Sequence, residues 1–208
     1  MTAQDYLYML RDQMHTVVFA TVGSDGSPYT CAIDIMLADT GGLYFLTARG
    51  KSLYHRLQQD SRVALTGVSG GDTLSSRSIS LQGRVREIGS ARLPEIFAQN
   101  PYMQKIYPSA DSRAALTVFC LYTGSGEYFD LSCQPIFRQR FSIGDGVLQK
   151  VGYYVTKRCT GCGRCQQSCP QNCIDCSRVP VQIIPSACLH CGRCQQVCPQ
   201  NAIERSRP

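Results

Sequence analysis

A fourteen-residue cysteine motif that occurs twice constrains this chain more than any other feature. CTGCGRCQQSCPQN (159–172) and CLHCGRCQQVCPQN (188–201) are identical at eleven of fourteen positions and lie 29 residues apart. Each copy has the spacing Cys-x2-Cys-x2-Cys-x3-Cys-Pro, which is the ligand run of bacterial proteins that bind two iron–sulfur clusters. An internal repeat of this kind predicts two similar sites.

The spacing also predicts which cysteines share a cluster. Three cysteines at two-residue intervals wrap around one cubane, whereas the fourth lies too far along to close the same site and reaches the other cluster. The expected 4Fe–4S ligand sets are therefore crossed: Cys159, Cys162, Cys165 and Cys198 for one, and Cys188, Cys191, Cys194 and Cys169 for the other. Zinc and disulfides are the alternatives. Zinc fits poorly because its sites usually use Cys-x2-Cys pairs.

Cysteine content and charge divide the chain near residue 148. The C-terminal segment holds ten of the thirteen cysteines and the whole net charge of +6, whereas the N-terminal segment has equal numbers of basic and acidic residues. We therefore predict two domains, 1–148 and 149–208, joined by the short connection Gly144–Lys150. Two clusters of about −2 each would offset about four positive charges, so nucleic acid is not an expected partner.

The sequence carries no sign of export or membrane insertion. It has no run of about 18 apolar residues, and MTAQDYLYMLRDQM at the N-terminus lacks a basic segment followed by an apolar one. We expect a cytoplasmic protein without a membrane partner. A reducing cytoplasm favours metal binding over disulfides for its cysteines.

The N-terminal domain has the pattern of short strands joined by tight turns. Helical spacing of apolar residues predicts an opening helix over 3–14, capped by Thr2. Strands are expected at 16–22, 28–37, 43–47, 63–68, 76–87, 114–122, 128–132 and 134–143, with helices at 51–59 and 91–107 and a turn at 124–126. The pattern predicts a mainly β fold, an antiparallel barrel with flanking helices, followed by a small α+β iron–sulfur domain.

One segment of this domain has the groups that bind phosphate. A strand ends at Thr47, the loop Arg49-Gly50-Lys51 follows, and Ser52 can cap the next helix. Two cations, hydroxyl groups and a helix N-terminus suit a phosphate. An ordinary loop with solvated basic side chains is the alternative.

The remaining cysteines are expected to have structural roles. Core positions on strands are predicted for Cys31, Cys120 and Cys133. We expect Cys173 to act as a small buried hydrophobe and Cys176 as a loop thiol. Their Cys-x2-Cys spacing leaves a redox pair or an extra metal ligand as the alternative.

Other side chains with possible chemistry give weaker signals. His15 and His55 lack metal-ligand spacing, and His55 is expected on a helix surface. His190 is expected near the second cluster without ligating it. Tyr153-Tyr154 are expected to pack beneath a cluster.

The order of elements resembles the pyridoxamine-phosphate-oxidase-like split-barrel flavoproteins over about residues 3–145. The likeness rests on PYTCAIDIMLADTGGLYFLT, the cationic turn into a helix, DSRVALTG, ISLQGRVREI, NPYMQKIYP and a last hairpin near PIFRQRFSIGDG. It implies a homodimer with FMN at the subunit interface and the FMN phosphate on Thr47–Ser52. From about Val151 to Ser206 the chain resembles the bacterial-type two-cluster ferredoxin module, which implies low-potential one-electron transfer.

Two departures from the oxidase pattern concern the flavin site. The oxidases carry a basic residue early in the strand that corresponds to Pro28–Leu37, where this chain offers Cys31, and their loop reads Ser-Arg-Lys where this one reads Arg-Gly-Lys-Ser. Flavin binding is still expected, but pyridoxine-phosphate chemistry is not.

The combined sequence features predict a flavin and iron–sulfur oxidoreductase. Electrons from a low-potential donor, either a redox protein or a small molecule, would pass through two 4Fe–4S clusters to FMN, which would reduce a small organic substrate. Reverse flow is equally compatible with the sequence, and no residue stands out as the proton donor. A ferredoxin-like carrier whose barrel only dimerises or binds flavin is the alternative, and a flavin store or sensor is the third possibility.

Overall fold

The computed structural model describes residues 1–149 and 151–206, which form two compact units. The first unit contains Met1–Ser69, Ser78–Tyr128 and Arg140–Val147. The second contains Gly70–Arg77, Phe129–Gln139 and the described chain from Leu148 onward. Two segments from the N-terminal half thus pack with the cysteine-rich half. Lys150, in the expected connection, lies outside the described residues.

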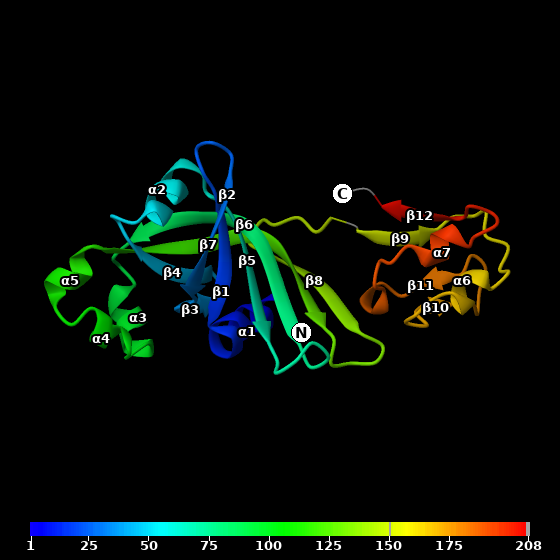
Figure 1. Ribbon diagram of the computed structural model, residues 1–208, viewed down its shortest axis with the longest axis horizontal. Helices are drawn as coiled ribbons and strands as arrows, with labels where there is room; N and C mark the ends of the chain where they lie inside the picture. Colours follow the sequence, from blue (N-terminus) through cyan, green and yellow to red (C-terminus); the bar gives the residue numbers. More distant parts are fainter. Residues whose placement is uncertain (150, 207–208) are drawn as a thin grey trace. The chain divides into compact units, whose positions relative to one another are not determined.

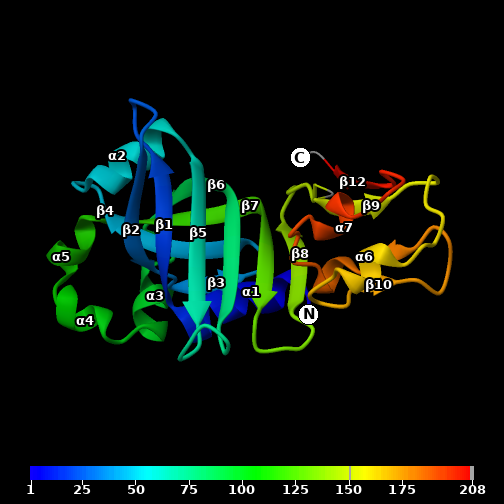
Figure 2. The ribbon, with the colours of Figure 1, turned by 45° about the vertical axis from the view of Figure 1, so that its right-hand side comes forward.

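Eight strands form one sheet, in which β2-β1-β5-β6-β7-β4-β3 are neighbours in that order and β8 pairs with β7 (Figures 1 and 2). The pairing is antiparallel at β1–β2, β1–β5, β3–β4 and β4–β7. The strands are β1 (Thr16–Val22), β2 (Pro28–Asp34), β3 (Leu37–Asp39), β4 (Gly42–Ala48), β5 (Arg62–Ser69), β6 (Arg77–Gly89), β7 (Leu116–Asp130) and β8 (Phe137–Ile143). The predicted mainly β, split-barrel fold is confirmed.

Alternating burial shows which face of the sheet is the core. On β1 the side chains of Val17, Phe19 and Thr21 are buried, while their neighbours are exposed or half-buried. Successive side chains of a strand point to opposite faces, so this alternation places one face inward. The Phe19 and Phe45 rings, from β1 and β4, lie 4.8 Å apart between centroids inside the barrel.

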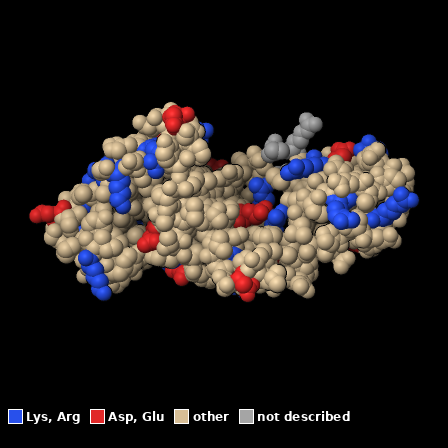
Figure 3. All heavy atoms as spheres, in the orientation of Figure 1, with Lys and Arg blue, Asp and Glu red and all other residues tan. Residues whose placement is uncertain are grey.

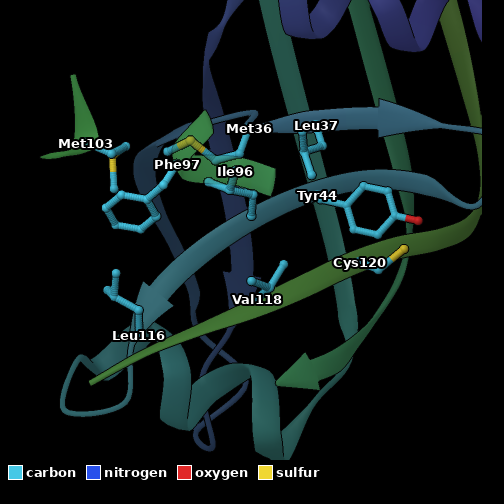
Figure 4. Packing of buried hydrophobic residues seen from close by; sticks show 9 residues of the cluster. All are labelled: Met36, Leu37, Tyr44, Ile96, Phe97, Met103, Leu116, Val118 and Cys120. Carbon is cyan, nitrogen blue, oxygen red and sulfur yellow. The ribbon is translucent and has the colours of Figure 1, made fainter. Parts of the chain in front are cut away.

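Helices cover the barrel at several places. The opening helix is confirmed as α1 (Ala3–Met9), which continues as the short π-helix η1 (Leu10–Met14). Thr2 forms the expected N-cap. The α2 helix (Ser52–Gln59) contacts β1 and β4. The α3 helix (Leu93–Gln99) buries Ile96 and Phe97 against alternate residues of β7 (Figure 4).

The expected helix over 91–107 is divided. After α3 the chain turns at Asn100-Pro101, and α4 (Met103–Ile106) is a separate turn of helix. The buried Asn100 side-chain amide donates to the Met36 carbonyl at 3.1 Å and to the Ile96 carbonyl at 2.9 Å, which satisfies backbone groups at the break. A short α5 helix (Ala110–Ala114), which the sequence pattern did not predict, follows.

The turn predicted at residues 124–126 is wrong, because β7 runs through it without interruption. The glycines there serve close packing instead. A Cβ on Gly124 would lie 2.3 Å from the Gln82 carbonyl oxygen, and one on Gly83 would lie 2.1 Å from the Thr123 oxygen. These strands approach so closely that only glycine fits.

Gly124→Ala is therefore expected to destabilise the barrel by about 1–3 kcal/mol, the usual cost of overpacking. Gly71→Ala is the matched control, since a Cβ there meets no atom within 4 Å. The midpoint of thermal unfolding, followed by circular dichroism, compares the two variants. Equal midpoints would show that the contact between these strands does not require glycine.

The cysteine-rich part of the second unit is built from two similar halves. Its elements are β9 (Gly152–Val155), α6 (Arg164–Gln167), β10 (Ile174–Asp175), β11 (Gln182–Ile183), the 3-10 turn η2 (Pro185–Ala187), α7 (Arg193–Gln196) and β12 (Ile203–Ser206). β9 pairs with β12, and β10 pairs with β11. Within each unit, the face seen in Figure 3 carries Lys and Arg in small separate groups.

Among the described residues, no helix combines the length and the apolar character that crossing a bilayer requires.

Candidate functional site

The two cysteine motifs line two cavities of equal size. Each has about 340 Å³ of empty volume, open solvent at its mouth included. The cysteines around the first cavity are Cys159, Cys162, Cys165 and Cys198. Those around the second include Cys169, Cys188, Cys191 and Cys194. The structure thus brings together the two crossed sets that the spacing predicts; that each set holds a cluster stays a prediction.

Backbone conformation explains why the motif needs its glycines. Gly163 and Gly192 precede α6 and α7 with φ of 74° and 79°, a left-handed conformation that glycine adopts without penalty. Two residues before these glycines, Gly161 and its repeat equivalent His190 also have positive φ, of 72° and 56°. The two loops therefore have the same backbone conformation at these positions although their sequences differ.

Backbone N–H groups point at the cysteine sulfurs. The nitrogen of Gly161 lies 3.4 Å from Cys159 Sγ, that of His190 lies 3.4 Å from Cys188 Sγ, and that of Ala202 lies 3.3 Å from Cys198 Sγ. Such donors stabilise negative charge on sulfur and tune a bound cluster. The donor set therefore fits iron–sulfur clusters with thiolate ligands.

The two additional cysteines of this half lie beside different sets. Cys173 is buried and lines the second cavity, with its Sγ 3.5 Å from that of Cys169. Burial and the neighbouring Cys169 raise the pKa of the Cys173 thiol. Cys176 is half-buried, and the pKa of its thiol is raised by burial, by Asp175 and by the neighbouring Cys159.

The segment predicted to bind phosphate contains an unsatisfied hydroxyl. Thr47, on β4, is 2% exposed, and among the described residues its Oγ1 has no hydrogen-bond partner. Lys51 is the N-cap of α2 and is exposed, and no side chain caps the first N–H groups of that helix. Gly50 and Ser52 are exposed beside it. Free helix N–H groups and a nearby cation fit a phosphate.

Arg49 differs from the expectation because it already has protein partners. Its guanidinium donates to the Ala114 carbonyl at 3.0 Å, and its Nε lies 4.0 Å from Glu87 Oε1. Glu87 also accepts hydrogen bonds from Thr117 and from Gln58. Arg49 therefore fastens the loop to the barrel, and its charge is partly compensated.

The sequence pattern did not single out Arg56, which lies in the last turn of α2 and supplies a second cation near this segment. Arg56 Nε donates to Thr21 Oγ1 at 2.8 Å, and its guanidinium lies 4.7 Å from the centre of the Tyr29 ring. Burial raises the pKa of the Cys31 thiol, while the charges of Arg56 and Lys51 lower it. Cys31 therefore lies near both cations.

A third cavity, with about 1010 Å³ of empty volume by the same measure, lies in the first unit. Its walls come from β1, β5, β6 and β7, and they include the Thr21 residue that Arg56 contacts. Arg62 lines it and forms a bridge to Asp60 at 2.6 Å, which lowers the pKa of Asp60 to about 2. The cavity and the Arg56 side chain of α2 therefore meet at Thr21.

Several predicted positions need correction. Cys133 is exposed in the loop between β7 and β8, and Cys31 is only half-buried because β2 is at the edge of the sheet, so of the three cysteines only Cys120 is in the core. Tyr153 lines the second cavity, as expected. Tyr154 is 48% exposed and donates to Glu204 instead, since neighbouring strand residues point to opposite faces. His55 is exposed, as predicted.

Solved structures with the same fold show what the barrel is similar to. A NimC/NimA family protein from Clostridium acetobutylicum shares 18% identity, covers 67% of this chain and 92% of its own, and has a TM-score of 0.57. A protein from the same organism, related to general stress protein 26 of B. subtilis (pyridoxinephosphate oxidase family), shares 16% identity over 68% of this chain and 96% of its own, with a TM-score of 0.50. At these identities the likeness concerns the fold alone.

The comparison with curated proteins gives no match. Two family models match the sequence: pyridoxamine 5'-phosphate oxidase over residues 8–124, which is more than half of the chain, and a 4Fe-4S dicluster domain over residues 153–202. The first match covers β1 to β6 and most of β7, and the second covers both cysteine motifs. The chain therefore belongs to the pyridoxamine 5'-phosphate oxidase family and carries a 4Fe-4S dicluster domain C-terminal to the barrel sequence.

Proposed function

We propose that this protein is an oxidoreductase that moves electrons between a low-potential donor, two 4Fe–4S clusters and FMN. The observation that carries the proposal is the pair of crossed four-cysteine cavities in the same chain as a flavin-family barrel. When bound, the clusters exchange single electrons, and the flavin exchanges one or two and can reduce a small organic molecule by hydride transfer. The protein's part is to hold and orient these groups.

Each cysteine set would hold one cluster at a distinct place in the second unit. The set of Cys159, Cys162, Cys165 and Cys198 is called site I below, and the set of Cys169, Cys188, Cys191 and Cys194 is called site II. The short helices α6 and α7 present one cysteine each, Cys165 and Cys194, from a buried position. Backbone N–H groups at both sites stabilise the charge of the thiolates.

The flavin phosphate would be held at the start of α2. Thr47, Lys51 and the uncapped helix N–H groups supply neutral and charged donors, and Arg56 supplies the second cation. Arg49, Gly50 and Ser52 shape the loop. The cavity that meets this region at Thr21 is large enough for part of a flat ring system. The family membership supports a homodimer with the flavin at the subunit interface.

A ferredoxin-like electron carrier is the second candidate. It is favoured by the exposure of Cys162 and Cys191, one cysteine of each set, which would let an outside redox protein approach both sites. In that case the barrel would serve for dimerisation or flavin binding without turnover, and the clusters would serve an outside redox protein.

Anaerobic purification followed by iron, sulfide and FMN quantitation tests the proposal. We expect about eight iron and eight sulfide per chain, from two four-iron clusters, together with one FMN. Reoxidation of the reduced flavin by an added organic acceptor would support the oxidoreductase, whereas full clusters without bound FMN would favour the carrier.

A further inference from the structure

Sites I and II have the same backbone frame, so a difference in their redox properties must come from side chains. The loops share their glycine conformations, their short helices and their N–H donors to sulfur. Even the exposed arginines correspond, since Arg164 lines the cavity of site I and Arg193 lines that of site II. These symmetric charges act on both sites alike.

Besides the Cys173 thiol, which has Ala202 as its equivalent at site I, a charged contact breaks this symmetry at site II. Arg138, on β8, places its NH1 group 2.7 Å from Nδ1 of His190, whose backbone nitrogen lies 3.4 Å from Cys188 Sγ. A guanidinium can only donate, so Nδ1 accepts this bond. Two residues earlier, the Ile136 N–H donates to the Gln171 side chain at 3.0 Å, and Gln171 lines the same cavity. Residues 136–138 thus form hydrogen bonds to both cysteine loops at site II, through Gln171 and through His190.

Site I has different neighbours at the corresponding place. The equivalent of His190 is Gly161, and a Cβ there would meet the Val179 side chain at 2.6 Å. The charges near site I are those of Asp175, which acts on Cys176 beside Cys159 and Cys162, and of the exposed Arg178, which acts on Asp175. Site I therefore has an apolar contact where site II has a half-buried guanidinium, and its nearby charges are of opposite sign.

Arg138 is suited to act on a cluster through its charge. Arginine stays protonated in proteins, and this side chain is half-buried, with its guanidinium 5.0 Å from the centre of the Phe129 ring. A charge that is partly removed from water is screened less than an exposed one. Because reduction adds a negative charge to a cluster, a nearby cation favours the reduced state.

We propose that Arg138, held on His190, makes the cluster at site II the higher-potential member of the pair, so that the first electron to enter rests there. This inference rests on the proposed function, since it needs clusters at both sites. Arg138 is a positioning and tuning residue that acts through its charge and through its hydrogen bond to His190. The lower-potential site I would then be the one that passes electrons on to site II.

A potentiometric titration of the anaerobic holoprotein, followed by EPR, tests the proposal. We expect two one-electron steps. Arg138→Gln should lower the equilibrium constant of the first step about tenfold, which is about 59 mV for one electron, and should leave the second step unchanged. Arg138→Lys, which keeps the charge, should retain most of the parent protein's potential for the first step. Arg205→Gln removes an exposed charge from the same unit, at a residue that lines neither cysteine cavity, and is the matched control.

Three results would overturn the inference: both potentials unchanged in Arg138→Gln, both shifted equally, or only the lower step shifted. An equal effect of Arg205→Gln would also do so, because it would show a general charge effect. Iron content separates these outcomes from a failure of the proposed function. A protein without clusters contradicts both claims, whereas full clusters with unshifted potentials contradict this inference alone.

Discussion

Removing Cys169 together with Cys173 is expected to abolish the cluster at site II and to leave the cluster at site I intact, so that iron falls from about eight to about four per chain. The reason is the crossed arrangement, in which Cys169 faces the cavity of the other repeat. Cys173 is included because its Sγ lies 3.5 Å from that of Cys169 in the same cavity and could replace it.

The internal repeat provides the matched control for this experiment. Cys198→Ala makes the equivalent change at site I and needs no second substitution, since Ala202 occupies the place of Cys173. Cys173→Ala or Cys176→Ala alone should keep both clusters. The EPR spectrum of reduced Cys169→Ala/Cys173→Ala should match that of Cys191→Ala. A match to Cys162→Ala instead would contradict the crossed arrangement.

Lys51→Ala and Arg56→Gln should each weaken FMN binding by about 10- to 100-fold. A charge-assisted hydrogen bond to a phosphate contributes about 1.5–3 kcal/mol, and about 1.4 kcal/mol corresponds to a factor of ten. Arg49→Gln should have a smaller effect, because Ala114 and Glu87 already engage this side chain. Fluorescence titration of the apoprotein with FMN measures the three affinities.

Riboflavin is the control ligand for these variants because it lacks the phosphate. Its affinity should be similar in the parent protein and in Lys51→Ala and Arg56→Gln. Unchanged FMN affinity in both variants would place the phosphate elsewhere. A parallel loss of riboflavin affinity would show that the substitutions disturb the ring site or the fold.

The features that sequence predicts best here are those encoded by local spacing. The cysteine motif predicts the crossed sets, because ligand geometry is set by spacing within a few residues. Alternation of apolar and polar residues predicts most strands for the same reason. Thr2 as a helix cap is a similarly local signal, and the structure confirms it.

The features that sequence does not predict depend on contacts between distant segments. Gly124 has the local signature of a turn, but the close approach of β6 explains why it is glycine. The local sequence around Arg56 is that of an exposed helix residue. Its contact with Thr21, 35 positions away, arises only because α2 packs on β1. The bond of Arg138 to His190 spans 52 positions, so no local pattern could reveal it.

We expect the clusters and the flavin of one protein to exchange electrons. Stopped-flow kinetics test this exchange most directly. Holoprotein with dithionite-reduced clusters and oxidised FMN is followed at several dilutions. The short chain between Ile143, at the end of β8, and Gly152, at the start of β9, keeps the two cofactor-binding parts tethered, and tethering makes an encounter intramolecular. We predict a rate of flavin reduction that is independent of protein concentration. A rate that rises in proportion to concentration would contradict the account and favour the electron carrier.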